Sequence, residues 1–154
     1  MTDATPEQPG SSPENPIDND AEWVKKQIDE YLATDGEKPL FRGSAPLLLL
    51  TTQGRKSGEW RRTALIHGED EGRQIIVASL GGAPKHPVWY LNLQANPEVY
   101  LTVGASSFYG TARTATPEEK PALWQKMVAI YPDYADYQVK TDREIPIVII
   151  DPKA

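Results

Sequence analysis

Apolar residues near the start of the chain recur at helical spacing. One stripe falls every three or four positions and comprises Val24, Ile28, Tyr31 and Leu32. Such a stripe lies on one face of an α-helix. Asp20 is a suitable N-cap for this helix and Gly36 a suitable stop, because an N-cap oxygen accepts free N–H groups and glycine tolerates the left-handed C-terminal conformation. We expect an amphipathic helix that lies on the rest of the fold as a lid.

Strand patterns follow this helix. Short runs rich in leucine, isoleucine, valine and threonine are bounded by glycine, proline or polar turns, which is typical of β-strands. The segment 68–72 predicts a turn and Gly104-Ala105 a hairpin connection. The first three runs therefore predict a β-meander. The expected strands are 47–52, 62–67, 74–79, 98–103, 107–114 and 145–150.

Two further helices are expected between the strands. One begins after Pro87 and ends at Asn96-Pro97, because proline disfavours helix at the preceding residue. The other begins with a capping box formed by Thr116 and Glu119, and it ends at Pro132. Few helices among many strands favour a closed or split β-barrel of the α+β class over alternating βαβ units.

Composition separates the N-terminal segment from the rest of the chain. Residues 1–20 are rich in proline and polar residues, a composition that buries too little apolar surface to offset the entropy of ordering. Residues 1–22 also hold six acidic residues and no Lys or Arg, and the other 16 acidic residues balance the 16 Lys and Arg. We expect a disordered acidic tail over 1–20 and a near-neutral folded domain over 21–154, which argues against nucleic acid as a partner.

Several classes of site and location are excluded or favoured by the same composition. The chain has no cysteine, so it has no disulfide and no thiolate, as is compatible with a reducing cytoplasm. Its two histidines, His67 and His86, lie too far apart in sequence for metal-ligand spacing, and we expect no metal. The longest apolar run, around 47–50, is too short to span a bilayer. We expect a cytoplasmic protein without stable membrane attachment.

A glycine-bounded turn with several cations is the first candidate site. It reads Gly54-Arg55-Lys56-Ser57-Gly58 and is followed by Arg61 and Arg62. Glycines let backbone N–H groups approach an anion, the cations neutralise it, and a serine hydroxyl donates to it, so the pattern suits a phosphate. A solvated hairpin with basic side chains explains the same residues, and the glycine spacing does not match a Walker motif.

The second candidate runs from the end of a strand through a glycine loop into a helix, from Ser79 to Asn92. Helix N-termini attract anions through their free N–H groups. Trp89 and Tyr90 can flank a planar ring, and Lys85 can pair with a negative group. The alternative is that these aromatic residues belong to the core.

Three tyrosines form the third candidate. Tyr131, Tyr134 and Tyr137 are spaced three apart just after the end of a helix. Phenol hydroxyls can donate a proton or bind a carbonyl or nitro oxygen. An aromatic cluster that caps the core explains the same spacing. No Gly-x-Ser-x-Gly elbow is present, so a serine hydrolase is unsupported.

In combination, these motifs resemble the deazaflavin-dependent nitroreductase family over about Pro46 to Pro152. The blocks occur in the same order as in that family and comprise Leu49-Leu50-Thr51-Thr52-x-Gly54-Arg55-Lys56-Ser57-Gly58, Ala78-Ser79-x-Gly81-Gly82-Ala83, Pro87-x-Trp89-Tyr90-Leu91-Asn92-Leu93-x-Ala95-Asn96-Pro97, Tyr131-Pro132-x-Tyr134-x-x-Tyr137 and Thr141-Asp142-Arg143-x-Ile145-Pro146-Ile147-Val148.

The resemblance implies an α+β split β-barrel of the flavin-reductase and pyridoxamine-phosphate-oxidase type, with flanking helices. It also implies that the reduced deazaflavin coenzyme F420 donates a hydride to a small-molecule acceptor, which is a quinone, a nitroaromatic compound or an enone. A reductase that uses FMN on the same fold and a non-catalytic deazaflavin-binding module are the alternatives. Barrels of this type often pair, so a homodimer is also expected.

The resemblance further implies roles for single residues. Ser79 and Tyr137 fall where relatives contact cofactor or substrate, and we assign them to orienting the acceptor or supplying its proton. Leu80 and Ile66 replace a lysine and a tyrosine of the family, so the identity of the substrate does not carry over. The expected cofactor-binding residues are Arg55, Lys56, Ser57, Arg61, Arg62, Thr63, Ala64, Leu65, Val77, Ala78, Ser79, Val88, Trp89, Tyr90, Asn92 and Tyr134.

Overall fold

A computed structural model describes residues 8–153 of the chain. Its helices are α1 (Glu22–Ala33), the short 3-10 helix η1 (Leu80–Gly82), α2 (Val88–Ala95), α3 (Lys120–Ile130) and α4 (Asp133–Lys140). Its strands are β1 (Ile17–Asp18), β2 (Leu47–Gln53), β3 (Trp60–Ile66), β4 (Gly68–Asp70), β5 (Arg73–Val77), β6 (Glu98–Val103), β7 (Ser106–Thr114) and β8 (Ile147–Pro152).

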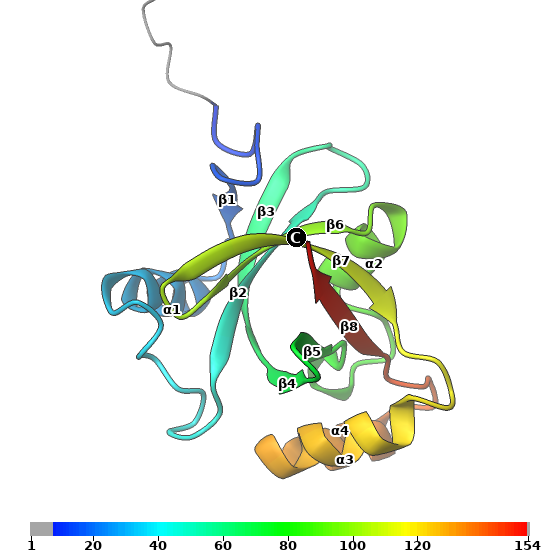
Figure 1. The fold of residues 1–154 in the computed structure, drawn as a ribbon. Coiled ribbons are helices and arrows are strands. Elements are labelled where there is room, and N and C mark those ends of the chain that lie inside the picture. The colour runs from blue at the N-terminus through cyan, green and yellow to red at the C-terminus, as the bar shows by residue number, and fades with distance from the viewer. Residues whose placement is uncertain (1–7, 154) are drawn as a thin grey trace, which may run out of the picture.

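The strands form one eight-stranded sheet in the order β1-β3-β2-β6-β7-β8-β5-β4. β3 lies near one end of this order and β4 at the other, yet only His67 separates them in the chain. The two ends of the sheet therefore meet at His67, and the sheet curls into a barrel that stays open between β3 and β5 (Figure 1). This confirms the predicted α+β split β-barrel.

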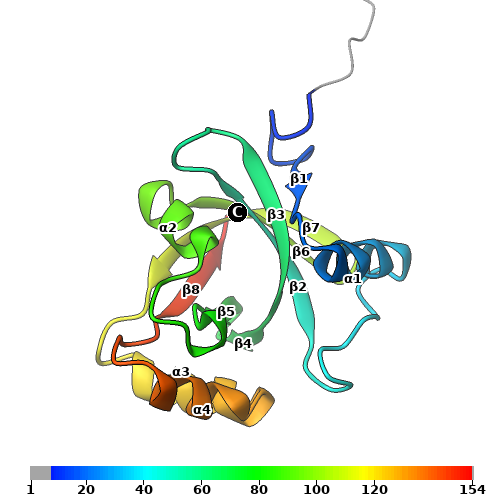
Figure 2. The same ribbon diagram turned by 180° about the vertical axis from the view of Figure 1, so that it is seen from behind.

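Apolar side chains fill the barrel and join the helices to it. The interior cluster includes Leu48, Leu50, Ile76, Leu101 and Val148, which are all fully buried. A second cluster attaches α3 and α4 to β5 and β8, and a third attaches α1 to β2. Figure 2 shows α1 on one flank of the barrel and the α3–α4 pair at its lower end. The amphipathic lid helix predicted from its apolar stripe is thus present as α1.

Most of the predicted elements are observed, with some differences. The N-cap of α1 is Ala21, without a side-chain cap, and not the predicted Asp20. The capping box is present, because the Glu119 N–H donates to Thr116 Oγ1 at 3.2 Å and the Thr116 N–H donates to Glu119 Oε1 at 2.9 Å. The predicted meander is wrong, because β5 pairs with β4 and β8 and not with β3. The helix α4 and the strand β4 were not predicted. The strand β4 forms a tight hairpin with β5 where the sequence predicted only a turn. The helix α4 is short, and it packs against α3 and the distant η1.

The N-terminal segment also differs from the expectation of a disordered tail up to residue 20. Residues 1–7 lie outside the described part of the chain, but from residue 8 the segment forms turns and β1, which pairs in parallel with β3. The backbone N–H of Trp60 donates to the carbonyl of Gly10 at 2.8 Å. These bonds join segments far apart in sequence, so local composition could not indicate them. Nowhere in residues 8–153 is a helix long and apolar enough to cross a membrane.

Candidate functional site

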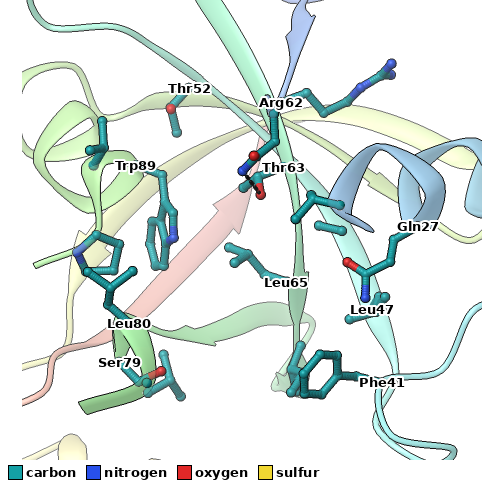
Figure 3. A pocket seen from close by; sticks show the side chains of 18 of the residues that line it. Gln27, Phe41, Leu47, Thr52, Arg62, Thr63, Leu65, Ser79, Leu80 and Trp89 are labelled. Atoms are coloured by element: carbon teal, nitrogen blue, oxygen red, sulfur yellow. Dashed lines mark hydrogen bonds between the residues drawn. The ribbon is translucent and has the colours of Figure 1, made fainter. Parts of the chain in front are cut away.

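A groove of about 530 Å³ runs along β3, at the opening of the barrel (Figure 3). Its volume is in the range of small-molecule and cofactor sites. The walls come from β3 itself, α1, the loop around η1, the start of α2 and the tyrosines of α4. In Figure 3, Leu65 of β3 points toward Trp89 of α2, and Gln27 of α1 lies on the other side of the strand.

The two faces of β3 serve different halves of the groove, because successive residues of a strand point to opposite faces. Leu65 packs against the interior cluster of the barrel, as Trp89 does from α2. Ala64 and Ile66 pack toward α1 instead. Arg61 and Thr63 share the face of Leu65, and Arg62 shares the face of Ala64.

Among the described residues, part of the β3 backbone has no hydrogen-bond partner and forms an open edge in this groove. The carbonyl of Arg62 accepts a hydrogen bond from the Asn19 N–H at 2.9 Å, on the side of β3 that faces away from β2. Backbone groups alternate sides along an antiparallel strand, so the N–H and C=O of Ala64 also face away from β2. β1 ends before it reaches Ala64. The groove therefore presents a backbone donor and a backbone acceptor beside an apolar slot.

Asn92 joins this groove to the cationic turn between β2 and β3. Its Oδ1 accepts from the backbone N–H of Arg55 at 3.1 Å, and its Nδ2 donates to Thr52 Oγ1 at 3.3 Å. Both bonds are made by a side chain that is almost fully buried. The turn is thus held against α2, next to the end of the groove that Thr52 and Asn92 line.

The cations in and after the turn differ in whether they line the groove. Arg55 and Lys56 are exposed, and neither they nor Ser57 line the groove. The Ser57 hydroxyl accepts from the Glu59 N–H at 3.1 Å, which stabilises the turn. Arg61 and Arg62 both line the groove.

The loop that carries Ser79 is held by one arginine. The Arg143 guanidinium donates to the carbonyl oxygens of Ala78 at 3.2 Å, Ser79 at 2.7 Å and Ala83 at 2.9 Å. Burial lowers the pKa of Arg143, and burial together with this arginine lowers the pKa of His86, 3.2 Å from it. No hydrogen bond within residues 8–153 engages the Ser79 hydroxyl. The loop therefore fixes Ser79 through its backbone and leaves its side chain available to a ligand.

The three tyrosines meet at the opposite wall, where their rings lie 5.0 to 6.2 Å apart. The Tyr131 hydroxyl donates to Asp133 Oδ2 at 3.1 Å and lies 3.0 Å from the Tyr137 hydroxyl. Because the Asp133 carboxylate, paired with Arg42, only accepts, the single proton of Tyr131 is used there. Tyr137 must then donate to Tyr131, which leaves only oxygen lone pairs directed to the groove.

Burial has a marked effect on these phenols. It raises the pKa of Tyr134, and burial followed by the hydrogen bonds to Tyr137 and Asp133 raises the pKa of Tyr131. Both side chains therefore remain neutral in the physiological range. They act through shape and hydrogen bonding and not through charge.

The structure brings most of the predicted site residues together. Tyr90 is an exception, because its ring lies in the barrel core and its hydroxyl bonds Thr114 Oγ1 at 2.7 Å. Ala78 is likewise in the core, and the turn residues Arg55, Lys56 and Ser57 lie beside the groove. The predicted residues that line the groove are Arg61, Arg62, Thr63, Ala64, Leu65, Val77, Ser79, Val88, Trp89, Asn92, Tyr134 and Tyr137.

Other lining residues were not predicted from the sequence. Several come from the segment before α1, from α1, from the loop between α1 and β2 and from the start of β2, and they include Asn19, Asp20, Trp23, Gln27, Phe41 and Leu47. Trp23 has 62% of its surface exposed although it is a large apolar residue, and Val88 and Leu80 of the same groove are also exposed. Exposed apolar residues gathered in a groove point to a ligand. Within the described residues, no group of His, Asp and Glu side chains could hold a metal ion.

Comparison with known proteins gives consistent results. A family model described as F420H(2)-dependent quinone reductase matches residues 23–152. An F420H(2)-dependent quinone reductase of Mycobacterium tuberculosis is 40% identical over 111 residues, which are 70% of this chain and 74% of that protein.

Two solved structures are also similar. One, titled as an F420-H2 dependent reductase, is 46% identical with a TM-score of 0.65 and covers 69% of this chain and 94% of its own. The other, titled as a domain-swapped dimer, is 43% identical with a TM-score of 0.67 and covers 84% of this chain and 97% of its own.

Proposed function

The chain belongs to the F420H(2)-dependent quinone reductase family, and on that premise we propose that it transfers a hydride from reduced coenzyme F420 to a quinone bound in the groove along β3. It is an oxidoreductase, and its cofactor is the deazaflavin. We extend the acceptors to nitroaromatic compounds and enones, because they too are electron-poor and accept a hydride.

One observation carries the assignment of the groove. The free N–H and C=O of Ala64 lie beside an apolar slot between Leu65 and Trp89, with cationic side chains near one end. A deazaflavin has a planar ring with amide-like edges and an anionic tail, so its groups match this slot, this backbone edge and these cations in turn. We expect Arg61, Arg55 and Lys56 to hold the tail, with Asn92 keeping the turn in place.

The bound coenzyme supplies the hydride, and the chain supplies binding, orientation and exclusion of water. Trp89 and Leu65 hold the ring between apolar surfaces. Ser79 is the candidate donor of a hydrogen bond or proton to the reduced acceptor, because its hydroxyl has no partner within the described residues. Tyr137 presents an acceptor oxygen to the groove, and we assign it to orienting the bound molecules.

The solved relative titled as a domain-swapped dimer supports a homodimer as a further proposal. A cytoplasmic location also stays a prediction.

A direct test combines binding with turnover. Purified protein is titrated with oxidised F420 and, in parallel, with FMN, with fluorescence as the signal. It is then mixed with reduced F420 and menadione, a nitroarene or a cyclic enone, and oxidation of the coenzyme is followed by absorbance. We expect preference for F420 and oxidation faster than the uncatalysed rate. Tighter binding of FMN than of F420 would exclude F420 as the cofactor. Binding of F420 without turnover of any acceptor would indicate a non-catalytic binding module.

A further inference from the structure

The segment of residues 8–21, which we call the strap, precedes the part of the chain that matches the family, which begins at residue 23. It runs along the beginning of β3 before the chain enters α1 (Figures 1 and 2). Asn19 fixes it at the groove, because its N–H donates to the Arg62 carbonyl at 2.9 Å and its Nδ2 to Thr63 Oγ1 at 3.2 Å. The strap therefore forms a wall of the groove that the family match does not include.

Asp18 of the strap also forms an ion pair with Arg62, one of the cations that line the groove. Asp18 Oδ1 accepts from Arg62 Nε at 2.6 Å, and its Oδ2 accepts from Nη2 at 3.2 Å. Only 19% of the arginine side chain and 25% of the aspartate side chain are exposed. Such two-point pairing of a guanidinium with a carboxylate is both strong and directional. Figure 3 shows Arg62 extending from β3 on the side of α1, away from Trp89.

Arg61 is in a different situation on the opposite face of the strand. Its side chain is 43% exposed, and its ion pair with Glu59 is long, at 3.5 Å. An anionic group that enters the groove therefore meets an accessible guanidinium on the Trp89 side of β3. On the α1 side it meets a guanidinium that a carboxylate already neutralises.

We propose that Asp18 is a specificity-determining residue of this groove: by neutralising Arg62, it restricts the anionic tail of the cofactor to the Arg61 side and weakens tail binding. This rests on the proposed function, since the tail is that of coenzyme F420. Arg62 is then an anchor for the strap and does not bind the cofactor directly.

The test compares two ligands in the full-length protein. Binding of oxidised F420, and of the same deazaflavin without its phosphate and glutamate tail, is measured by fluorescence titration for wild type and Asp18→Asn. We expect Asp18→Asn to bind F420 about three- to tenfold more tightly at low salt, because a negative charge near the tail is removed. The gain should shrink at high salt, and affinity for the tail-less ligand should change less than about twofold.

Two further variants complete the experiment. Asp29→Asn makes the same charge change on an exposed part of α1 that does not line the groove, and it should change F420 affinity less than about twofold. The double variant Asp18→Asn with Arg62→Gln removes both charges together, so F420 affinity should stay within about twofold of wild type. Thermal unfolding is recorded for each variant, and Asp18→Ser, which also removes the carboxylate, replaces Asp18→Asn if that variant does not fold.

Three results would overturn the proposal. These are unchanged or weaker F420 binding by Asp18→Asn, an equal change for both ligands, and a tenfold loss in the double variant, which would make Arg62 a direct ligand. Failure of the proposed function looks different, because the wild-type protein would then bind neither deazaflavin.

Discussion

Two hydroxyl groups that face the same groove differ in what they can do. Ser79 keeps its hydroxyl proton available, since Arg143 binds only its backbone carbonyl. The proton of Tyr137 is directed to Tyr131, because the proton of Tyr131 is directed to Asp133. At the scale of single residues, the hydrogen bonds around each hydroxyl thus make Ser79 a donor to the groove and Tyr137 an acceptor.

The two hydroxyls should respond differently to removal. Ser79→Ala should lower kcat about tenfold with little change in cofactor affinity, because a hydrogen bond that strengthens during reaction is lost. Tyr137→Phe should mainly raise KM, because a binding contact is lost. Steady-state kinetics with reduced F420 and menadione separate these effects. Tyr100→Phe, which removes a hydroxyl on β6 outside the groove, is the matched control. A larger loss of kcat in Tyr137→Phe than in Ser79→Ala would reverse the assignment.

At the scale of elements, the distance between Ser79 and Tyr137 depends on how η1 packs against α4. Gly82 is buried, with φ of +83°, and a Cβ at this position would lie 2.8 Å from the carbonyl oxygen of Tyr137. Only glycine permits both the left-handed backbone and this close approach. Arg143 holds the same loop around η1 by donating hydrogen bonds to three of its backbone carbonyl groups.

Gly82→Ala should therefore destabilise the fold by about 2–4 kcal/mol, from backbone strain and steric overlap together. Gly72 is a matched control, because its φ is +77° and a Cβ there meets nothing within 4 Å. Gly72→Ala should cost only about 1 kcal/mol, from strain alone. Urea unfolding measures both. Equal losses would show that contact between η1 and α4 adds nothing to the strain.

At the scale of the whole molecule, the barrel closes where β3 continues into β4 through His67. This histidine is buried, and its Nδ1 lies 2.7 Å from Gln74 Oε1. The Gln74 Nε2 donates to Glu69 at 3.0 Å, so Oε1 is the acceptor and Nδ1 carries the proton. Burial lowers the pKa of His67 from the ordinary value of 6.5, although Gln74 and Glu69 oppose the shift.

Stability should consequently depend on pH below neutrality. The unfolded chain binds a proton near pH 6.5 and the folded chain only at lower pH, so the free energy of unfolding falls as pH decreases below about 6.5. One such group contributes a slope of at most about 1.4 kcal/mol per pH unit. Urea unfolding between pH 8 and pH 5 should show this decrease, and His67→Gln should reduce it. His86→Gln keeps His67 and should keep more of the slope. An equal slope in wild type and His67→Gln would contradict the explanation.

Periodicity and caps determined the local elements from sequence alone. The stripe of α1, the capping box before α3 and the alternation of the strands depend on residues a few positions apart, and the motifs around Ser79 and Tyr137 also indicated most of the groove. The tertiary structure alone decided the contacts between residues far apart in sequence. Asp18 forms an ion pair with Arg62, which is 44 positions away, and the two ends of the sheet meet at His67 because β5 pairs with β8. Trp89 and Tyr90 are neighbours on α2, but Trp89 lines the groove and Tyr90 lies in the core. Spacing along the sequence defines the faces of a helix, whereas tertiary packing decides which segment each face contacts.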